Sequence, residues 1–275
     1  MVELLSEELV ETLKTLENPK FMATKDNAGE PNIALVLSWT VYPDGKRLVY
    51  GEFMNNKTRK NLEAGNNELG LLVMTTDLDN WMIRADFESY HRNDEIYEFI
   101  AMTPLFKYNQ YTRARSVGVA HPLWSSPNYK FAKLSVLSSF VKAKLAARKI
   151  PVVETDEGNM PRNILERFNR MVAVKAIAFV DDNGYLSLFP SFGIVPASSN
   201  RLVVHRSEEK RRGLELKDGQ RVAVALATLE PAAFQVKGTF RVISDSVGII
   251  DLDRVYASSL PRPGVRVDLP MLERV

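Results

Sequence analysis

The chain of 275 residues contains no cysteine. This absence excludes a disulfide framework, iron–sulfur clusters held by thiolates, zinc sites built from cysteine, and a cysteine nucleophile. The sequence also lacks an apolar run of the roughly 20 residues that a membrane-spanning helix requires. Its 36 basic and 34 acidic residues leave a formal net charge of only +2. We therefore expect neither a nucleic-acid partner nor a membrane partner on the basis of charge.

Several common catalytic motifs are also missing. There is no G-x-G-x-x-G after a strand, no P-loop, no G-x-S-x-G elbow and no H-E-x-x-H zinc motif. The three histidines, His91, His121 and His205, are far apart in the sequence. We therefore expect no metal site, and phosphate-ester hydrolysis has no visible nucleophile. The start of the chain is acidic where a secretory signal would be basic, which predicts a cytoplasmic protein.

What is present is the composition of a soluble globular protein, with 45% hydrophobic and 25% charged residues. Leu5, Leu9, Leu13 and Leu16 share one helical face, and Ser6 suits the start of that helix. Short strands separated by turn residues follow, with one basic helix at 57–65 among them. The predicted strands are residues 21–24, 31–38, 47–51, 69–74 and 81–87. Such spacing indicates a small closed sheet.

The same order of elements returns in the second half of the chain. A helix opened by residues 159–161 precedes strands at 173–180, 185–191, 200–204, 221–226 and 234–240. Four unlike landmarks keep nearly one offset: Gly29 to Gly184 is 155 positions, Leu48 to Leu202 is 154, Leu62 to Leu214 is 152 and Arg84 to Lys237 is 153. Any two β-rich domains share turn glycines, but the matching order and the second basic helix favour an internal duplication.

The segment between the repeats is less regular. Residues 94–102 fit either a helix or a strand, and residues 105–127 show no clear periodicity. We therefore predict three parts: residues 1–127 as the first repeat with an extension, residues 128–158 as a basic helix and linker, and residues 159–275 as the second repeat.

The predicted helix at 128–150 carries Leu134, Leu137, Val141 and Leu145 on one face and lysines elsewhere. A helix of this kind suits an anionic or membrane surface. The alternative, which we prefer, is a helix packed on the protein with a solvated basic face.

Residues 55–61, Asn-Asn-Lys-Thr-Arg-Lys-Asn, follow a predicted strand and open a short helix. Three cations, a hydroxyl and free backbone donors at a helix start are what a phosphate monoester needs. On spacing alone, the segment fits a phosphate site and a solvated basic helix equally well.

The opening of the chain resembles the pyridoxamine 5′-phosphate oxidase-like FMN-binding split barrels. Members of that superfamily combine an Ala-Thr strand, an Asp-x-x-Gly-x-Pro turn, a phosphate-binding Lys-x-x-Asn-Leu segment and a strand containing Arg or Lys. Here the matching residues are 23–31, 57–62 and 83–85. The resemblance covers residues 1–90 and, more faintly, 160–245. It implies a mainly β fold with helices, built as two tandem split β-barrels, with FMN as the cofactor.

The resemblance also implies roles for individual residues. Those at the FMN phosphate are Lys57, Thr58 and Lys60, with Arg59 nearby and Asn61 bracing the loop. Those along the isoalloxazine edge are Ser38, Trp39 and Thr40, and those beside the ribityl chain and ring are Glu52, Phe53 and Met54. Trp39 fits a core position equally well, and Arg84 either reaches the cofactor or completes the barrel.

The second repeat departs from this pattern where the phosphate would bind. Glu208 and Glu209 occupy the entrance that should be electropositive, although Lys210, Arg211 and Arg212 follow. Gly213 replaces Asn61, and Leu186 stands at the place of Pro31. We therefore expect the second repeat to be a structural partner without a flavin.

Two classes of function remain open. The first is an FMN-dependent oxidoreductase acting on an unidentified small molecule, in which the flavin carries the electrons. The second is a non-catalytic module that uses the same barrel to bind haem, a deazaflavin or a protein partner. The flavin of this superfamily usually lies at a dimer interface, so the resemblance implies either a homodimer or an intramolecular pseudo-dimer.

Overall fold

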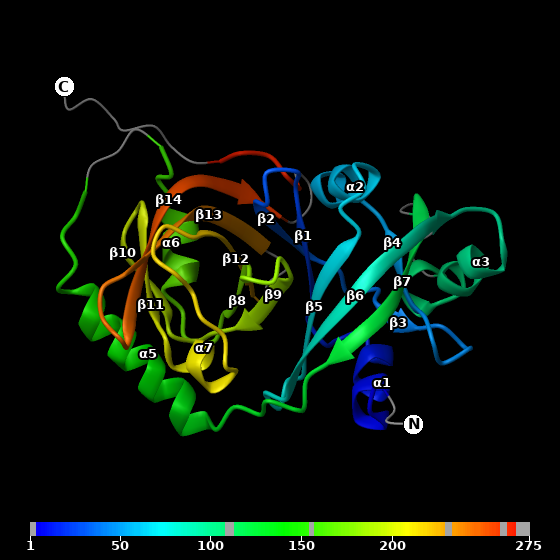
Figure 1. The fold of residues 1–275 in the computed structure, drawn as a ribbon, viewed down its shortest axis with the longest axis horizontal. Helices are drawn as coiled ribbons and strands as arrows, with labels where there is room; N and C mark the ends of the chain where they lie inside the picture. Colours follow the sequence, from blue (N-terminus) through cyan, green and yellow to red (C-terminus); the bar gives the residue numbers. More distant parts are fainter. Residues whose placement is uncertain (1–3, 108–112, 154–156, 229–232, 259–262, 268–275) are drawn as a thin grey trace. The chain divides into compact units, whose positions relative to one another are not determined.

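The computed structural model describes residues 4–107, 113–153, 157–228, 233–258 and 263–267. The chain forms two compact units, Met1–Asn27 with Ala34–Lys130 and Ala28–Ile33 with Phe131–Val275. Two seven-stranded antiparallel sheets are present, one for each repeat (Figure 1). The ends of the predicted repeats, residues 1–3 and 268–275, lie outside the described residues.

The first half of the chain folds into one short N-terminal helix, seven strands and the helices between them. In order these are α1 (Glu7–Lys14), β1 (Lys20–Lys25), β2 (Pro31–Leu35), β3 (Thr40–Val41), β4 (Leu48–Glu52), α2 (Asn56–Glu63), β5 (Glu68–Met74), β6 (Asn80–His91), α3 (Glu95–Ala101), α4 (Pro104–Lys107) and β7 (Ser116–Ser125).

The second half begins with two helices and then repeats the pattern of strands. Its elements are α5 (Lys133–Ala147), α6 (Arg162–Phe168), β8 (Val174–Val180), β9 (Leu186–Pro190), β10 (Ile194–Ser198), β11 (Arg201–His205), α7 (Ser207–Arg211), β12 (Arg221–Ala227), β13 (Ala233–Val242) and β14 (Val247–Ala257). Among the described residues, no helix combines the length and the apolar character needed to cross a membrane.

The two sheets have the same strand order. The first runs β2-β1-β5-β6-β7-β4-β3, and the second runs β9-β8-β12-β13-β14-β11-β10. Each strand of the first sheet therefore corresponds to the strand of the second sheet whose number is seven higher, for example β1 to β8. This confirms the predicted fold class: a mainly β protein with helices, built as two tandem split β-barrels related by internal duplication.

A buried lysine marks the same point in both repeats. Lys20 Nζ donates to the Thr15 carbonyl at 2.7 Å, and Lys175 Nζ donates to the Arg170 carbonyl at 2.8 Å. Both carbonyls lie just beyond the last turn of a helix, α1 or α6, where acceptors lack intrahelical partners and a cation is favoured. Each lysine is only 1% exposed. The two positions are 155 residues apart, which matches the offset of the turn glycines.

The helix predicted at the start of the chain is confirmed. Ser6 is its N-cap, and its hydroxyl accepts a hydrogen bond from the Leu9 N–H at 3.3 Å. Leu9 and Leu13 are fully buried in the core of the first unit together with Trp39 and Trp81.

Strand β4 is buried on both faces, which explains why the first unit needs helices on two sides. Leu48 and Tyr50 point into the core that α1 also joins, whereas Val49 points to the opposite face. That face is covered by α3, through Ile96 and Ile100. The segment that fitted either a helix or a strand is therefore a helix, capped by Asp94, whose carboxylate accepts from the Tyr97 N–H at 2.9 Å.

Residues 28–33 belong to the second unit, which gives the predicted turn motif a structural role there. The Glu30 carboxylate accepts from Lys237 at 2.7 Å and also pairs with Arg221 and Arg254. Burial alone would raise the pKa of Glu30, but hydrogen bonds from Arg254 and Lys237 outweigh it and lower that pKa to about 2.

The prediction for the helix at 128–150 is wrong about the packed face. The helix, α5, packs through Val136, Ser139 and Ala143, which are buried. The leucine face is exposed instead: Leu134 is 80% exposed, Leu137 48%, Val141 44% and Leu145 51%. The reason is steric, because small side chains at 139 and 143 let the helix approach the second sheet closely at Val195 and Val203.

Burial of Lys175 makes the stability of the fold depend on pH. Burial, with a smaller effect of Lys144, lowers the pKa of Lys175 from 10.5 to about 7. The unfolded state therefore binds more protons between pH 7 and 10.5, so the free energy of unfolding should rise with pH across that window, by up to about 1.4 kcal/mol per unit.

Lys175→Met should remove this dependence. We expect the wild type to gain stability relative to the variant between pH 7.5 and 9.5, measured by urea unfolding. The exposed Lys133→Met variant is the matched control and should track the wild type. A difference between wild type and Lys175→Met that does not change with pH would contradict the assignment.

Candidate functional site

The predicted phosphate-binding segment forms the first turns of α2. Asn55 is the N-cap and makes no side-chain capping hydrogen bond, and the first turn holds no acidic residue. Lys57 is half-buried, Lys60 is exposed and Thr58 is buried. The positive end of the helix dipole and two lysines one turn apart therefore lie together at this helix start.

Two parts of the sequence motif meet at α2. Asn61 Nδ2 donates to the hydroxyl of Thr24 at 2.9 Å, which ties α2 to strand β1. Thr24 is the threonine of the Ala-Thr strand, and it is fully buried. The contact holds the helix start in one position against the sheet.

Arg59 is engaged with carboxylates. Its guanidinium lies 3.1 Å from Glu52 and 2.7 Å from Glu63, and it stacks over the ring of Tyr90 at 4.6 Å. Its charge is therefore largely balanced within the first unit by these two carboxylates.

Glu52 is the centre of a buried polar network at the end of β4. The side chain is completely buried, and one oxygen, Oε2, accepts from Arg59 and from the Ser116 hydroxyl at 3.3 Å. Arg115 lies 3.7 Å from the same oxygen. The other oxygen, Oε1, is buried and has no hydrogen-bond partner among the described residues. A buried acceptor of this kind is costly unless a donor reaches it.

Two tyrosines extend the network. The hydroxyls of Tyr50 and Tyr90 lie 3.2 Å apart. Burial raises the pKa of both groups, Tyr50 the more strongly. Both phenols are therefore neutral at physiological pH and act as hydrogen-bonding groups. The Tyr50 ring rests on Gly118 of β7, where any Cβ would come within 2.2 Å of it.

The remaining predicted residues occupy several environments. Ser38 is buried, and its hydroxyl bonds to the backbone N–H and carbonyl of Gly51 at 3.1 and 3.2 Å. Trp39 is 1% exposed in the core and stacks on Tyr50 at 4.4 Å, which is the core position that the sequence left open. Thr40 and Phe53 are half-buried, and Met54 is exposed.

Arg84 lies on β6 and stacks over Trp124 of β7 at 5.5 Å. This contact joins two neighbouring strands of the barrel, and it is separate from the network around Glu52.

Sequence reasoning missed Tyr50, Tyr90, Arg115 and Ser116. The first two lie in predicted strands or just beyond them, but nothing in the sequence marks them as a pair. Arg115 and Ser116 come from the stretch without periodicity that becomes the start of β7. The only available signal was the concentration of arginine and aromatic residues in that stretch.

The second repeat has an ion pair at the equivalent place, with the charges exchanged. Arg206 comes directly after β11, and Glu52 is the last residue of β4, so the two occupy similar places in their repeats. The guanidinium of Arg206 forms a bidentate pair with the carboxylate of Glu209 in α7, at 2.6 and 2.9 Å. Glu208 pairs with Arg212 and, at 3.6 Å, with Arg211. Both glutamates are buried. No group of three or more His, Asp or Glu side chains in the described ranges is arranged to hold a metal ion.

Breaking the Glu52–Arg59 pair from one side should destabilise the first unit. Arg59→Met leaves the buried carboxylate with only Arg115 and the Ser116 hydroxyl among the contacts described above, which should cost about 3 kcal/mol, since losing one partner of a buried pair typically costs 3–5 kcal/mol. The double variant Glu52→Gln/Arg59→Met removes both charges and should recover most of that loss. Urea unfolding measures both. A double variant as unstable as Arg59→Met would contradict the pairing.

No protein-family model and no curated protein matches the chain. Three of the solved structures that resemble it, described next, each cover 46% of this chain. An FMN-binding protein from Syntrophomonas wolfei is 18% identical over 89% of its own length, with a TM-score of 0.38. HupZ of Group A Streptococcus is 22% identical over 94% of its length, also at 0.38. HutZ, the haem storage protein from Vibrio cholerae, is 11% identical over 96% of its length, at 0.36. At these values the likenesses do not bear on activity, and the fold class rests on the two strand orders.

Proposed function

We propose that the chain is an FMN-binding flavoprotein whose first repeat holds the flavin phosphate at the start of α2. The observation that carries the proposal is the composition of that helix start: no acidic residue, no side-chain cap, and Lys57 and Lys60 one turn apart. A phosphate dianion is stabilised there by the lysines and by the helix dipole.

The buried acceptor in the network supports the same placement. Glu52 Oε1 lies at the end of β4, four residues before α2 begins, and it needs a hydrogen-bond donor. The ribityl hydroxyls and the ring N–H of a flavin are donors of the right kind. Arg59 and Arg115 offset the charge of Glu52, which would otherwise repel a nearby phosphate.

Bound FMN would supply electron and hydride transfer, so we propose an oxidoreductase that acts on an unidentified small molecule. In this proposal Lys57, Thr58 and Lys60 bind the phosphate, and Asn61 positions the helix through Thr24. Thr40, Phe53 and Met54 keep exposed surface that can contact the ring.

The spectrum of the purified protein tests the cofactor. We expect absorbance bands of oxidised flavin that are released as FMN on denaturation. A Soret band, or a deazaflavin spectrum with no FMN, would instead favour the binding module for those ligands.

Removal of the two lysines tests the placement. Lys57→Ala/Lys60→Ala deletes two charge-assisted contacts worth about 1.5–3 kcal/mol each, so FMN affinity should fall by at least a hundredfold. Flavin fluorescence titration gives the affinity, and circular dichroism checks the fold. Lys14→Ala/Lys46→Ala removes the same charge from exposed sites elsewhere in the first repeat and should leave affinity unchanged. Undiminished flavin retention in the Lys57/Lys60 variant would refute the placement.

We also propose that only the first repeat binds flavin. In the second repeat the cations near α7 are engaged by carboxylates: Arg206 with Glu209, Arg211 and Arg212 with Glu208, and Lys210 with Asp245. A phosphate would have to compete with buried, charge-assisted pairs. Titration of the apoprotein with FMN should saturate near one flavin per chain. Saturation near two would overturn this asymmetry.

A further inference from the structure

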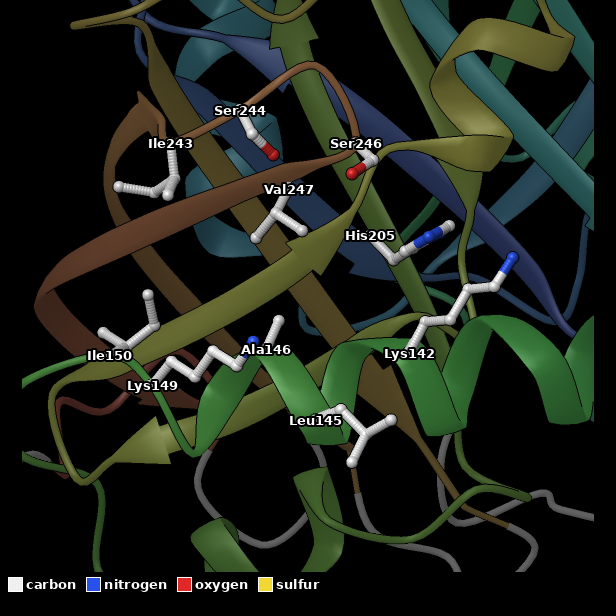
Figure 2. Close-up of a pocket in the computed structure, with 10 residues that line it drawn as sticks. All are labelled: Lys142, Leu145, Ala146, Lys149, Ile150, His205, Ile243, Ser244, Ser246 and Val247. Carbon is white, nitrogen blue, oxygen red and sulfur yellow. The ribbon is translucent and has the colours of Figure 1, made fainter.

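A cavity of about 370 Å³ lies in the second unit, between α5 and the turn that joins β13 to β14. Figure 2 shows α5 on one side of it, and on the other the turn with Ser244 and Ser246 and the end of β11 with His205. No residue of the proposed flavin site lines it.

One wall of the cavity is cationic. Lys142 lies on α5 and Lys149 lies just after the end of that helix, and both line the cavity. Both are exposed. Within the described ranges neither forms an ion pair or a side-chain hydrogen bond. In contrast, the intervening Lys144 donates to Asn169.

Nearby groups leave that positive charge unbalanced. Burial, together with the charge of Lys142, lowers the pKa of His205, so the imidazole is neutral at physiological pH. His205 Nδ1 lies 2.9 Å from the Ser207 hydroxyl. No carboxylate is among the described residues that line the cavity, and Asp245, in the turn beside it, pairs with Lys210.

The opposite wall and floor are apolar. Ile150, Ile243 and Val247 line the cavity, and Ile243 is 52% exposed. The Ser244 and Ser246 hydroxyls stand at its edge (Figure 2). Exposed apolar surface beside unpaired cations is complementary to a molecule with an anionic head and an apolar body.

The equivalent place in the first repeat is filled. His205 corresponds to Gly51, 154 positions earlier. There the Phe106 ring rests on the glycine, so close that a Cβ would come within 2.3 Å of it, and Ile100 lies beside it. In the second repeat α5 packs on β10 and β11, and the cavity lies beside His205.

We propose that this cavity binds a small amphiphilic anion, a carboxylate or phosphate monoester attached to a hydrocarbon group. Lys142 and Lys149 bind the anionic head, and Ile150, Ile243 and Val247 contact the hydrocarbon. The source is either a free amphiphile or a lipid headgroup, since the exposed Leu137, Val141 and Leu145 continue from the cavity along α5.

Calorimetric titration of the full chain with octanoate tests the proposal. Octanoate should bind, octylamine should not, and Lys142→Ala/Lys149→Ala should weaken octanoate binding at least tenfold. Lys133→Ala/Arg148→Ala removes the same charge from the start and the C-cap of α5, outside the cavity, and should change affinity less than twofold. Ile243→Ser should weaken octanoate binding severalfold.

Co-sedimentation with vesicles separates the two sources. Lysine-dependent binding to phosphatidylglycerol vesicles but not to phosphatidylcholine vesicles identifies a lipid headgroup; lysine-dependent binding of soluble octanoate alone identifies a free amphiphile. The proposal is overturned if neither ligand binds, if octylamine binds as tightly as octanoate, or if the two double variants behave alike. None of these results depends on flavin, so they are independent of the proposed function.

Discussion

The buried carboxylate of Glu52 at the end of β4 constrains the whole candidate site. An uncompensated charge in that position would cost several kcal/mol, so a cation must be held beside it. Arg59 provides that cation from the second turn of α2, and Ser116 and Arg115 add to it from the edge of β7. The helix cannot shift without breaking this pair. The start of α2 is therefore fixed relative to the sheet by electrostatics on one side and by the Asn61–Thr24 hydrogen bond on the other.

The second repeat also has a buried ion pair between the end of a strand and the helix that follows, but the positive and negative partners are exchanged. Arg206 occupies the position after β11, and Glu209 of α7 balances it. Either arrangement balances a buried charge at the end of the strand, and the strand order of the two sheets is the same. The consequence for ligand binding differs. In the second repeat the glutamates lie in the first turn of α7 and pair with the cations around it. In the first repeat the helix carries the arginine instead, and the first turn of α2, where Lys57 lies, contains no acidic residue.

The repeats also differ in what covers the outer face of each sheet. In the first, α3 and α4 bring Ile100 and Phe106 against β4, and the ring of Phe106 closes the surface over Gly51. In the second, α5 lies on β10 and β11 through Ala143, and a cavity lies between α5 and the turn that joins β13 to β14. The divergence of these covering helices, rather than of the barrels, produces a filled surface in one repeat and an open cavity in the other.

Short-range patterns in the amino-acid sequence are enough to predict the local elements and their repetition. The leucine spacing of α1, the turn at Gly29 and the order of strands around α2 follow from short-range periodicity and turn chemistry, which act within a few residues. Which side chains come into contact depends on the folded chain. Strand β7 lacks alternation because it is central and its first half is buried on both faces. Helix α5 has two apolar faces, and it packs on the sheet through the face with the smaller side chains, because Ser139 and Ala143 allow a closer approach. Glu52, Arg59, Arg115 and Tyr90 form one network although they are up to 63 positions apart, since burial and pairing of charges depend on folded geometry rather than on sequence spacing.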